Sequence, residues 1–279
     1  MAVHRIDIVK LSGIFGVAIL MMIGTQVGAR SEHQIGGRTA SVVFADPDLA
    51  GLARAACVGD AASAGSAIHS GVDPNGAGMQ NFTPLGWAVS CGNLAGVKAL
   101  LEGGGAPNRL MGDAYSPTFL AAGSPNPEVL QLLLEHGGDP NATDERNGDT
   151  ALSKAFLRGA HGQGWECYYI LLDGGADINK VDRYGLTIAN TVLGADHYDK
   201  LVELLVRGYN QNLEFLARRI GLDSENEARG LHPDFGDQAA SRQKVILLLE
   251  TRGLKVRAMP EIDLNQPEGE YEANRVMGE

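Results

Sequence analysis

The residues of this chain that could carry chemistry are few and scattered. No two histidines stand at the spacing expected of metal ligands. They are His4, His33, His69, His136, His161, His197 and His232. The sequence has no Gly-x-Ser-x-Gly nucleophile motif, no His-Glu-x-x-His zinc motif and no Gly-Lys-Ser/Thr phosphate loop. The stretch DPNATDERNGDT resembles a calcium loop but lacks the central glycine and the closing glutamate. We therefore expect no catalytic residue, no cofactor and no metal ion.

The composition favours many short elements joined by tight turns. The 279 residues include 37 glycines, 44% are hydrophobic and only 6% are aromatic. The net charge of −11 argues against a nucleic-acid-binding protein, because such proteins gain affinity from Lys and Arg contacts with phosphates. It also argues against general adhesion to anionic lipid.

Residues 1–29 have the pattern of an export signal. A basic start with Arg5 and Lys10 precedes an apolar run from Leu11 to Ile23, and small residues follow at positions 27–29. We expect cleavage after Ala29 and a periplasmic or secreted bacterial protein. The alternative is an uncleaved inner-membrane anchor with the chain facing the periplasm, because the apolar stretch is almost long enough to span a bilayer.

A period of about 33 residues recurs along the rest of the chain. Five short motifs of the type Gly-x-x-x-Asn end at Asn75, Asn108, Asn141, Asn179 and Asn212. A pair such as Leu-Leu precedes most of the motif glycines, and glycine readily adopts the left-handed conformation that ends a helix.

A second motif opens each unit and keeps the same phase. The matching residues are Thr83, Ser116, Thr150 and Thr187, and proline follows the first two of them. Ser and Thr cap helix N-termini, and proline fits the first helical position. Each unit is therefore predicted to consist of a turn, a helix, a short loop and a second helix.

The period and both motifs resemble the ankyrin repeat. TPLGWA, residues 83–88, is similar to the family's Thr-Pro-Leu-His-x-Ala, and NKVDRYGLT, residues 179–187, is similar to its inter-repeat hairpin. Gly86 and Phe119 stand where the family usually has histidine. The resemblance implies an all-α solenoid of about five to six repeats with inter-repeat hairpins, in which each repeat is covered by its neighbours.

The resemblance also sets the expected domain boundaries. We expect a flexible lead-in at residues 30–45, an ankyrin domain at residues 46–257 and an acidic disordered tail at residues 258–279. Between Glu261 and Glu279 the tail carries six acidic residues and one arginine, without apolar periodicity.

The three cysteines leave two alternatives open. Cys167 falls where the second helix of a repeat faces the core, so we expect a buried thiol. Cys57 and Cys91 precede the loop glycines Gly59 and Gly92, at the ends of the first helices of neighbouring repeats. Equivalent points in stacked repeats are about 10 Å apart, which is too far for a disulfide unless the repeats are offset. The two residues are either bridged or two separate small residues at helix ends.

Ankyrin family members bind other macromolecules through their hairpin tips and the groove side of their first helices. Carried over by matching position, the resemblance implies that the protein-binding residues are Met79, Gln80, Phe82, Asp113, Tyr115, Arg146, Asp149, Arg158, Arg183 and Tyr184. Tyr and Phe suit interface anchors because they offer a large, rigid contact area. The alternative is that Phe82 and Tyr115 pack only on the next hairpin.

We therefore expect a non-enzymatic protein-binding module in the periplasm, most simply a monomer that is a scaffold or protector of a partner protein. One alternative is an immunity protein that neutralises a secreted toxic enzyme. An alternative of a different class is an enzyme with an unrecognised site. The net negative charge suggests a partner with a basic patch.

Overall fold

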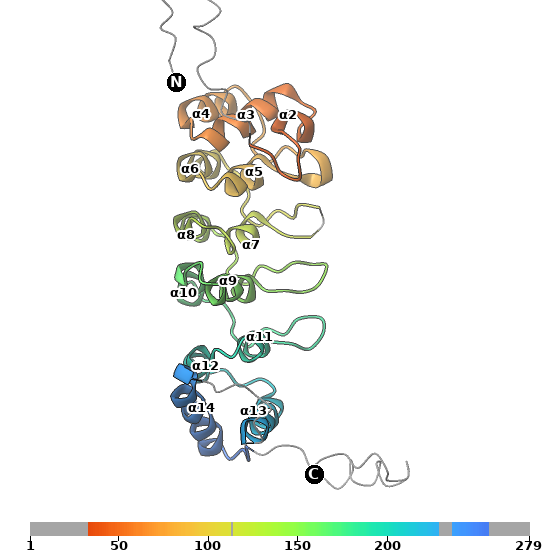
Figure 1. Ribbon diagram of the computed structural model, residues 1–279. Coiled ribbons are helices and arrows are strands. Elements are labelled where there is room, and N and C mark those ends of the chain that lie inside the picture. The colour runs from red at the N-terminus through yellow and green to blue at the C-terminus, as the bar shows by residue number, and fades with distance from the viewer. Residues whose placement is uncertain (1–32, 113, 229–235, 257–279) are drawn as a thin grey trace, which may run out of the picture.

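The computed structural model describes residues 33–112, 114–228 and 236–256 (Figure 1). The expected signal segment, the start of the expected lead-in, Asp113 and the expected acidic tail lie outside these residues. Within them the fold is all-α: it has thirteen α-helices and two short 3-10 helices, and the only extended pairing is a set of isolated bridges.

Consecutive helices form six pairs that stack into a solenoid. In chain order the pairs are α3 (Pro47–Val58) with α4 (Ala61–His69), α5 (Pro84–Cys91) with α6 (Leu94–Glu102), α7 (Pro117–Ala121) with α8 (Pro127–Glu135), α9 (Ala151–Ala160) with α10 (Glu166–Asp173), α11 (Ile188–Gly194) with α12 (Tyr198–Val206), and α13 (Leu213–Ala228) with α14 (Ala239–Thr251). Figure 1 shows the first helices in one row, the second helices in another, and hairpins projecting beside the first row. This arrangement confirms the expected solenoid.

The periodic asparagines bind each repeat to the next. Asn75 Nδ2 donates to the Gly104 carbonyl at 2.8 Å, and Asn75 Oδ1 accepts from the Ala106 N–H at 2.8 Å. Asn108 makes the same pair of bonds to Gly137 and Asp139, both at 2.8 Å. The 33-residue period therefore places each asparagine amide where it can bond a carbonyl and an N–H of the following turn.

The motif residues end and begin the helices as expected. The motif glycines Gly71, Gly104, Gly137, Gly175 and Gly208 all have φ between 83° and 100°, which favours glycine. Thr83 Oγ1 accepts from the Gly86 N–H at 3.1 Å, so it caps α5. Such a cap contributes about 1 kcal/mol.

The core runs between the two rows of helices. The first leucine of each Leu-Leu pair is fully buried, at Leu100, Leu133, Leu171 and Leu204. Each of these side chains meets the neighbouring helices, so the core is continuous along the stack. Truncating one of these leucines to alanine would cost about 2–5 kcal/mol.

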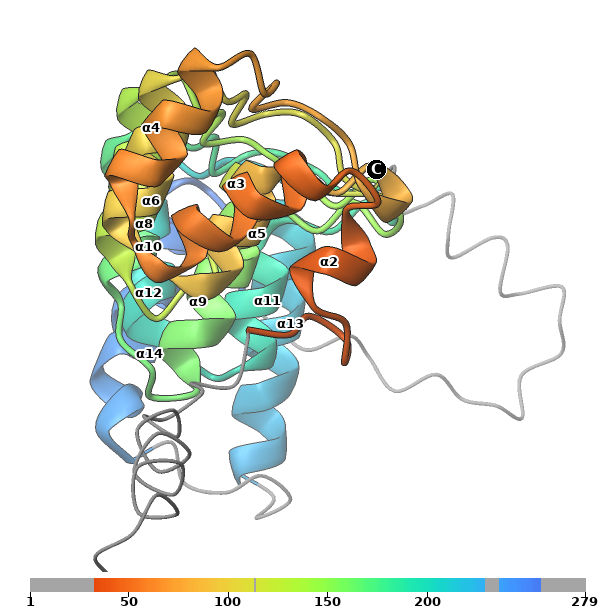
Figure 2. The ribbon, with the colours of Figure 1, turned by 90° about the horizontal axis from the view of Figure 1, so that it is seen from above.

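The prediction of a flexible lead-in is wrong for the part of it that the structure describes. Of residues 30–45, the described part includes the short helix α2 (Ala40–Val43), and Ala40 and Phe44 are buried. Figure 2 shows α2 beside α3 on the hairpin side of the stack. Gly78 in the first hairpin lets the end of α2 come close, because a Cβ at Gly78 would lie 2.6 Å from the Val43 carbonyl oxygen. The segment is ordered because its apolar residues pack against the first repeat, which has no preceding repeat to cover it within the described part of the chain.

None of the helices in the described parts of the chain is both long and apolar enough to cross a membrane.

Candidate functional site

A cavity of about 420 Å³ opens among the first hairpin tips and the lead-in. Its lining combines apolar side chains, backbone and two arginines. The residues are Ile35, Arg38, Val43, Gly78, Met79, Gln80, Asn81, Phe82, Trp87, Met111, Gly112, Ala114, Tyr115 and Arg146. We call this the hairpin cavity. No carboxylate stands among these described lining residues, so Arg38 and Arg146 are the charged groups of the lining.

Backbone hydrogen bonds hold successive hairpin tips together. The Gly112 N–H donates to the Gln80 carbonyl at 2.5 Å, and the Glu145 N–H donates to the Ala114 carbonyl at 2.6 Å. Arg183 continues the row by donating from its guanidinium to the Glu145 carbonyl. The tips therefore form a continuous edge along the solenoid and hold the cavity walls in place.

Arg146 is fixed at the rim of the cavity by a buried carboxylate. Asp144 is only 6% exposed, and it accepts from Arg146 Nε at 3.0 Å and from Nη2 at 2.7 Å. The Arg146 hydrogen bond lowers the pKa of Asp144 from its ordinary value. The guanidinium carbon also lies 5.5 Å from the centroid of the Tyr115 ring, which is within the range of a cation–π contact. Arg146 therefore presents a pre-oriented cation to the cavity.

Trp87 is among the lining residues of the cavity and is 1% exposed. Phe44 and Phe82 meet its ring edge-on, with centroids 6.0 and 6.3 Å away. Gly86, the departure from the family's histidine, leaves the space that Met111 fills, because a Cβ at Gly86 would lie 2.1 Å from Met111 Sδ. The unusual glycine is thus explained by close packing beneath the cavity.

The cavity wall contains two consecutive non-glycine residues in the left-handed region. Gln80 has φ 54° and Asn81 has φ 56°. Such conformations cost free energy and concentrate where a backbone must be presented in a particular way. Here they turn the chain so that Met79 stands at the cavity while Phe82 returns to the core.

The structure gathers half of the sequence-predicted binding residues at the cavity. These are Met79, Gln80, Phe82, Tyr115 and Arg146. Met79 is 46% exposed, whereas Phe82 and Tyr115 are half-buried and also pack against core rings. For Phe82 and Tyr115, packing and cavity lining therefore occur together.

The other predicted residues are spread along the solenoid. Asp149, Arg183 and Tyr184 lie on the later hairpins, and Tyr184 is 68% exposed. Arg158 is at the last turn of α9, where its guanidinium donates to the Gln163 carbonyl and braces the expanded loop before α10. Asp113 lies outside the described residues.

Sequence reasoning missed the contribution of the lead-in. Ile35 and Arg38 exchange backbone hydrogen bonds of 3.0 and 3.1 Å around Gly36 and Gly37, both with positive φ. A Gly-Gly pair between extended residues is a known signal for a two-residue turn, and it was available in the sequence. The missed side chains are Ile35, Arg38, Val43 and Met111.

A second group of rings and a cation lies at the expanded loop of the fourth repeat. Its members are Phe156, Trp165, Tyr168, Tyr169, His197 and Lys200, and we call it the lysine cluster. Lys200 is 8% exposed; its Nζ lies 4.7 Å from the centroid of the Trp165 ring and donates to the Tyr169 hydroxyl at 2.5 Å. Gly159 makes room for Trp165, since a Cβ there would lie 2.2 Å from the ring.

Cys57 and Cys91 are joined by a disulfide, with Cα atoms 5.4 Å apart. The spacing of about 10 Å that we expected between equivalent points does not hold here. A Cβ at Gly96 would lie 1.8 Å from the Ala56 carbonyl oxygen, so this glycine brings α6 against the end of α3. The two repeats are therefore unusually close at this point. Cys167 is a free thiol and only 2% exposed, and burial raises its pKa.

The comparison with protein families decides what kind of solenoid this is. A family model described as ankyrin repeats, in three copies, matches residues 52–144 and 118–215. The chain belongs to the ankyrin repeat family. Ankyrin repeats are protein–protein interaction modules, and the family is typically non-enzymatic. Comparison with curated proteins gives no match.

Proposed function

We propose that this ankyrin protein is an exported, non-enzymatic binding module that captures a resident periplasmic protein through the hairpin cavity and the adjoining tips, and that it is a scaffold or protector of that partner. The observation that carries the proposal is the cavity itself. It brings five of the predicted contact residues, drawn from different repeats, to one opening of about 420 Å³.

The chemistry of the cavity indicates what enters it. Met79, Phe82 and Tyr115 offer apolar surface, while Arg38 and Arg146 offer guanidinium donors. A partner segment with a large apolar side chain beside a carboxylate or backbone carbonyl would satisfy both. Tyr and Arg are also among the residues that dominate binding energy at protein interfaces.

Two features support export. Residues 1–29 have the signal pattern, and Cys57 is joined to Cys91. Disulfides persist in oxidising compartments and are rare in the cytosol. A periplasmic location accommodates both features.

The acidic charge of the chain provides a separate, long-range contribution. Without Arg5, Asp7 and Lys10 the net charge of −11 becomes −12, and the stretch from Glu261 to Glu279 supplies −5 of it. Such a field steers association with a partner that carries a basic patch elsewhere on its surface. We expect the association rate to fall with salt and on truncation after Pro260. Association rates that do not change in either experiment would contradict electrostatic steering but would not contradict binding at the cavity.

The test is capture of the partner from periplasmic extract by the chain without residues 1–29. A variant with Met79→Ser and Tyr184→Ser should lose the captured protein, because both side chains are exposed at the hairpin tips. The matched control is Val206→Ser with Leu247→Ser, which removes two exposed apolar side chains from the second-helix row.

The outcomes separate the functional alternatives. Loss of capture in the tip variant but not in the control supports binding at the cavity and the adjoining tips, and equal capture by both contradicts it. A captured housekeeping enzyme that survives heat or oxidation longer in the complex is the expected protector result. A captured toxic enzyme whose activity falls on binding would instead establish an immunity protein.

A further inference from the structure

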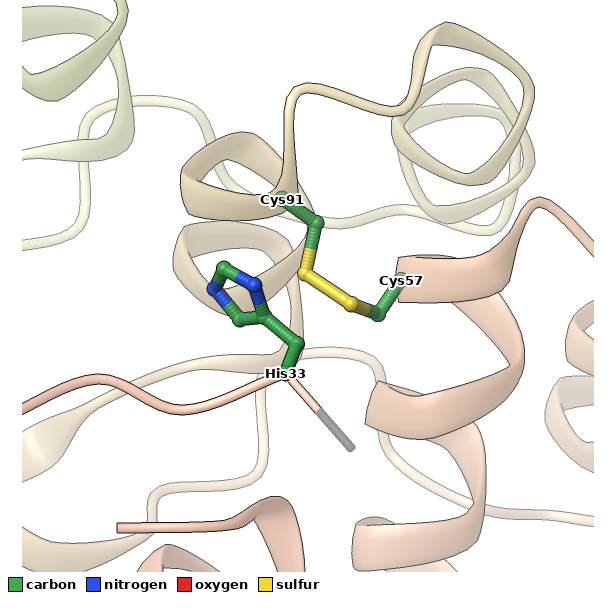
Figure 3. Close-up of side chains that lie close together, drawn as sticks. All are labelled: His33, Cys57 and Cys91. Atoms are coloured by element: carbon green, nitrogen blue, oxygen red, sulfur yellow. A yellow bond between two sulfur atoms is a disulfide. The ribbon is translucent and has the colours of Figure 1, made fainter. Parts of the chain in front are cut away.

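A histidine from the lead-in stands against the disulfide. His33, Cys57 and Cys91 are all half-buried, and one ligating atom of each lies within 4.8 Å of the others. Figure 3 shows the three side chains converging from the lead-in, the end of α3 and the end of α5, with the His33 ring facing the sulfurs. Histidine nitrogen and cysteine sulfur are the ligand types that zinc prefers.

The hydrogen bonds around His33 favour the tautomer that a metal ligand needs. Ser90 Oγ donates to the Trp87 carbonyl at 2.7 Å, which uses its only proton. This leaves Ser90 Oγ as an acceptor toward His33 Nε2, 3.4 Å away, and so favours the tautomer in which Nε2 carries the hydrogen. Nδ1 is left with its lone pair free. A histidine that donates through one ring nitrogen while the other binds the ion is the usual arrangement at metal sites.

The ring is also held by packing. His33 meets Trp87 edge-on, with centroids 5.6 Å apart and an interplanar angle of 89°. Because Trp87 is fully buried, the orientation of the imidazole is set before any ligand arrives. Ile35, two residues after His33, lines the hairpin cavity, so the backbone that carries His33 leads directly into one wall of that cavity.

We propose that reduction of the Cys57–Cys91 bridge opens a zinc site in which Cys57 Sγ, Cys91 Sγ and His33 Nδ1 are three of four ligands and water is the fourth. The Cα separation of 5.4 Å suits two cysteines that share one ion. Once the S–S bond is broken, rotation of the side chains lets the sulfurs separate to the roughly 3.8 Å that two thiolates about 2.3 Å from a tetrahedral ion require.

The chemistry balances with a dithiol as reductant. The dithiol gives two electrons and two protons to the bridge, so that two cysteine thiols form and the dithiol becomes a disulfide. Zn²⁺ then displaces both thiol protons, which leave to solvent, and binds the two thiolates and the neutral imidazole. The oxidised bridge offers no thiolate, so the site is closed until reduction.

The experiment is a Zn²⁺ titration of the full chain, oxidised and after reduction with a phosphine, in competition with a coloured chelator. The reduced chain should bind one Zn²⁺ and the oxidised chain none. His33→Ala should weaken binding by more than about tenfold, the lower end of what losing even a supporting group costs. Co²⁺ should give thiolate-to-metal charge-transfer absorption in the reduced chain only.

Two matched variants test the assignment. His69→Ala removes an exposed histidine and Cys167→Ala removes the other thiol, and neither should change the affinity. Zinc binding that is equal in oxidised and reduced chains, or unchanged in His33→Ala, would overturn the proposal.

Reduction without metal could also unfold the first repeats. In that case the helical circular dichroism of the reduced chain should recover when Zn²⁺ is added, and it should not recover in Cys57→Ser with Cys91→Ser. Failure of Zn²⁺ to restore the signal, or to bind a reduced chain that is still folded, equally rejects the site.

Discussion

The hairpin cavity and the lysine cluster both place a cation against aromatic rings. At the cavity, Arg146 lies over Tyr115 and is exposed to solvent. In the cluster, Lys200 lies over Trp165 and is 8% exposed. A cation–π contact thus occurs once at an opening and once in a closed interior. The cavity can still exchange its water for a partner, whereas the contacts of the cluster are already made within the chain.

The partners of the two cations explain this difference. Arg146 is held by Asp144 within its own hairpin, two residues away, so one face of its guanidinium stays free. Lys200 reaches across repeats to Tyr169, with Asp199 and Glu203 within 3.8 Å. A cation whose contacts lie within one hairpin can be presented to a ligand, whereas Lys200 also contacts Trp165 and Tyr169 of the preceding repeat and so holds two repeats together. We therefore expect mutations in the cluster to act on stability and mutations at the cavity to act on binding.

The largest effect should come from Phe156→Ala in the lysine cluster. Phe156 is 0% exposed and meets Trp165, Tyr168 and His197. Its truncation leaves a cavity among rings that cannot collapse, so the free energy of unfolding should fall by about 3–5 kcal/mol. Urea unfolding followed by circular dichroism measures this loss. Met79→Ala is the counterpart at the cavity, and a similar loss there would break the comparison.

Lys200→Met should have the next largest effect. It keeps the length of the side chain but removes the charge over Trp165 and the hydrogen bond to Tyr169. We expect a loss of about 2–3 kcal/mol, because a desolvated cation–π contact contributes about 2 kcal/mol and Asp199 and Glu203 each lose a cation that lies within 3.8 Å. Thermal unfolding of both chains at the same ionic strength gives the value. A stability unchanged within error would mean that the rings alone hold the cluster.

The sequence predicted the solenoid and part of the hairpin cavity. The period of Asn75, Asn108 and Asn141 predicted the solenoid because the Oδ1 of each asparagine accepts the same bond from a backbone N–H of the next turn. Such bonds recur at fixed spacing, so a periodic pattern reveals them. The placement of Met79 and Tyr115 at one opening followed from the same register.

The unpredicted features depend on contacts outside the period. His33 meets Cys57 and Cys91 only because the lead-in folds back on the first repeats, and no spacing in the sequence records that contact. The close approach at Gly96 likewise replaced the regular repeat distance that we assumed for the cysteines. Lys200 is 35 residues beyond Trp165, and nothing in its local sequence distinguishes it from a surface lysine.

A third test concerns Lys154, another cation that lies against an aromatic ring. Its Nζ lies 4.5 Å from the centroid of the Phe119 ring, and burial lowers its pKa from 10.5 to about 8, although Asp144 acts in the opposite direction. Between pH 8 and 10.5 the unfolded chain therefore holds more protons than the folded chain. The free energy of unfolding should rise with pH through this window, and the cost of burying the charge is present in full below pH 8.

Lys154→Met should remove that cost. A pKa that falls from 10.5 to about 8 corresponds to about 3 kcal/mol, and loss of the cation–π contact with Phe119 offsets about 1 kcal/mol of it. We therefore expect the variant to be more stable than the parent at pH 7 by on the order of 2 kcal/mol. The difference between the two chains should shrink as pH rises toward 10.5. Comparing the chains at each pH cancels the titration of other groups. A constant difference across pH 7–10.5 would show that the lysine is not desolvated.

The smallest effect on stability should come from Arg38→Ala, at the second arginine of the hairpin cavity. Arg38 is exposed, and the structure records hydrogen bonds only for its backbone, within the turn to Ile35. Its truncation should change the free energy of unfolding by less than about 0.5 kcal/mol, as for most surface substitutions. Arg146→Ala is the informative contrast, because the buried carboxylate of Asp144 loses both guanidinium hydrogen bonds and keeps only the backbone N–H of residue 146, which should cost about 1–3 kcal/mol. Both variants should nevertheless weaken capture of the partner, measured with purified components at fixed salt. If Arg38→Ala binds like the parent while Arg146→Ala does not, the lead-in closes the cavity without contacting the partner, and the binding surface is confined to the hairpin tips.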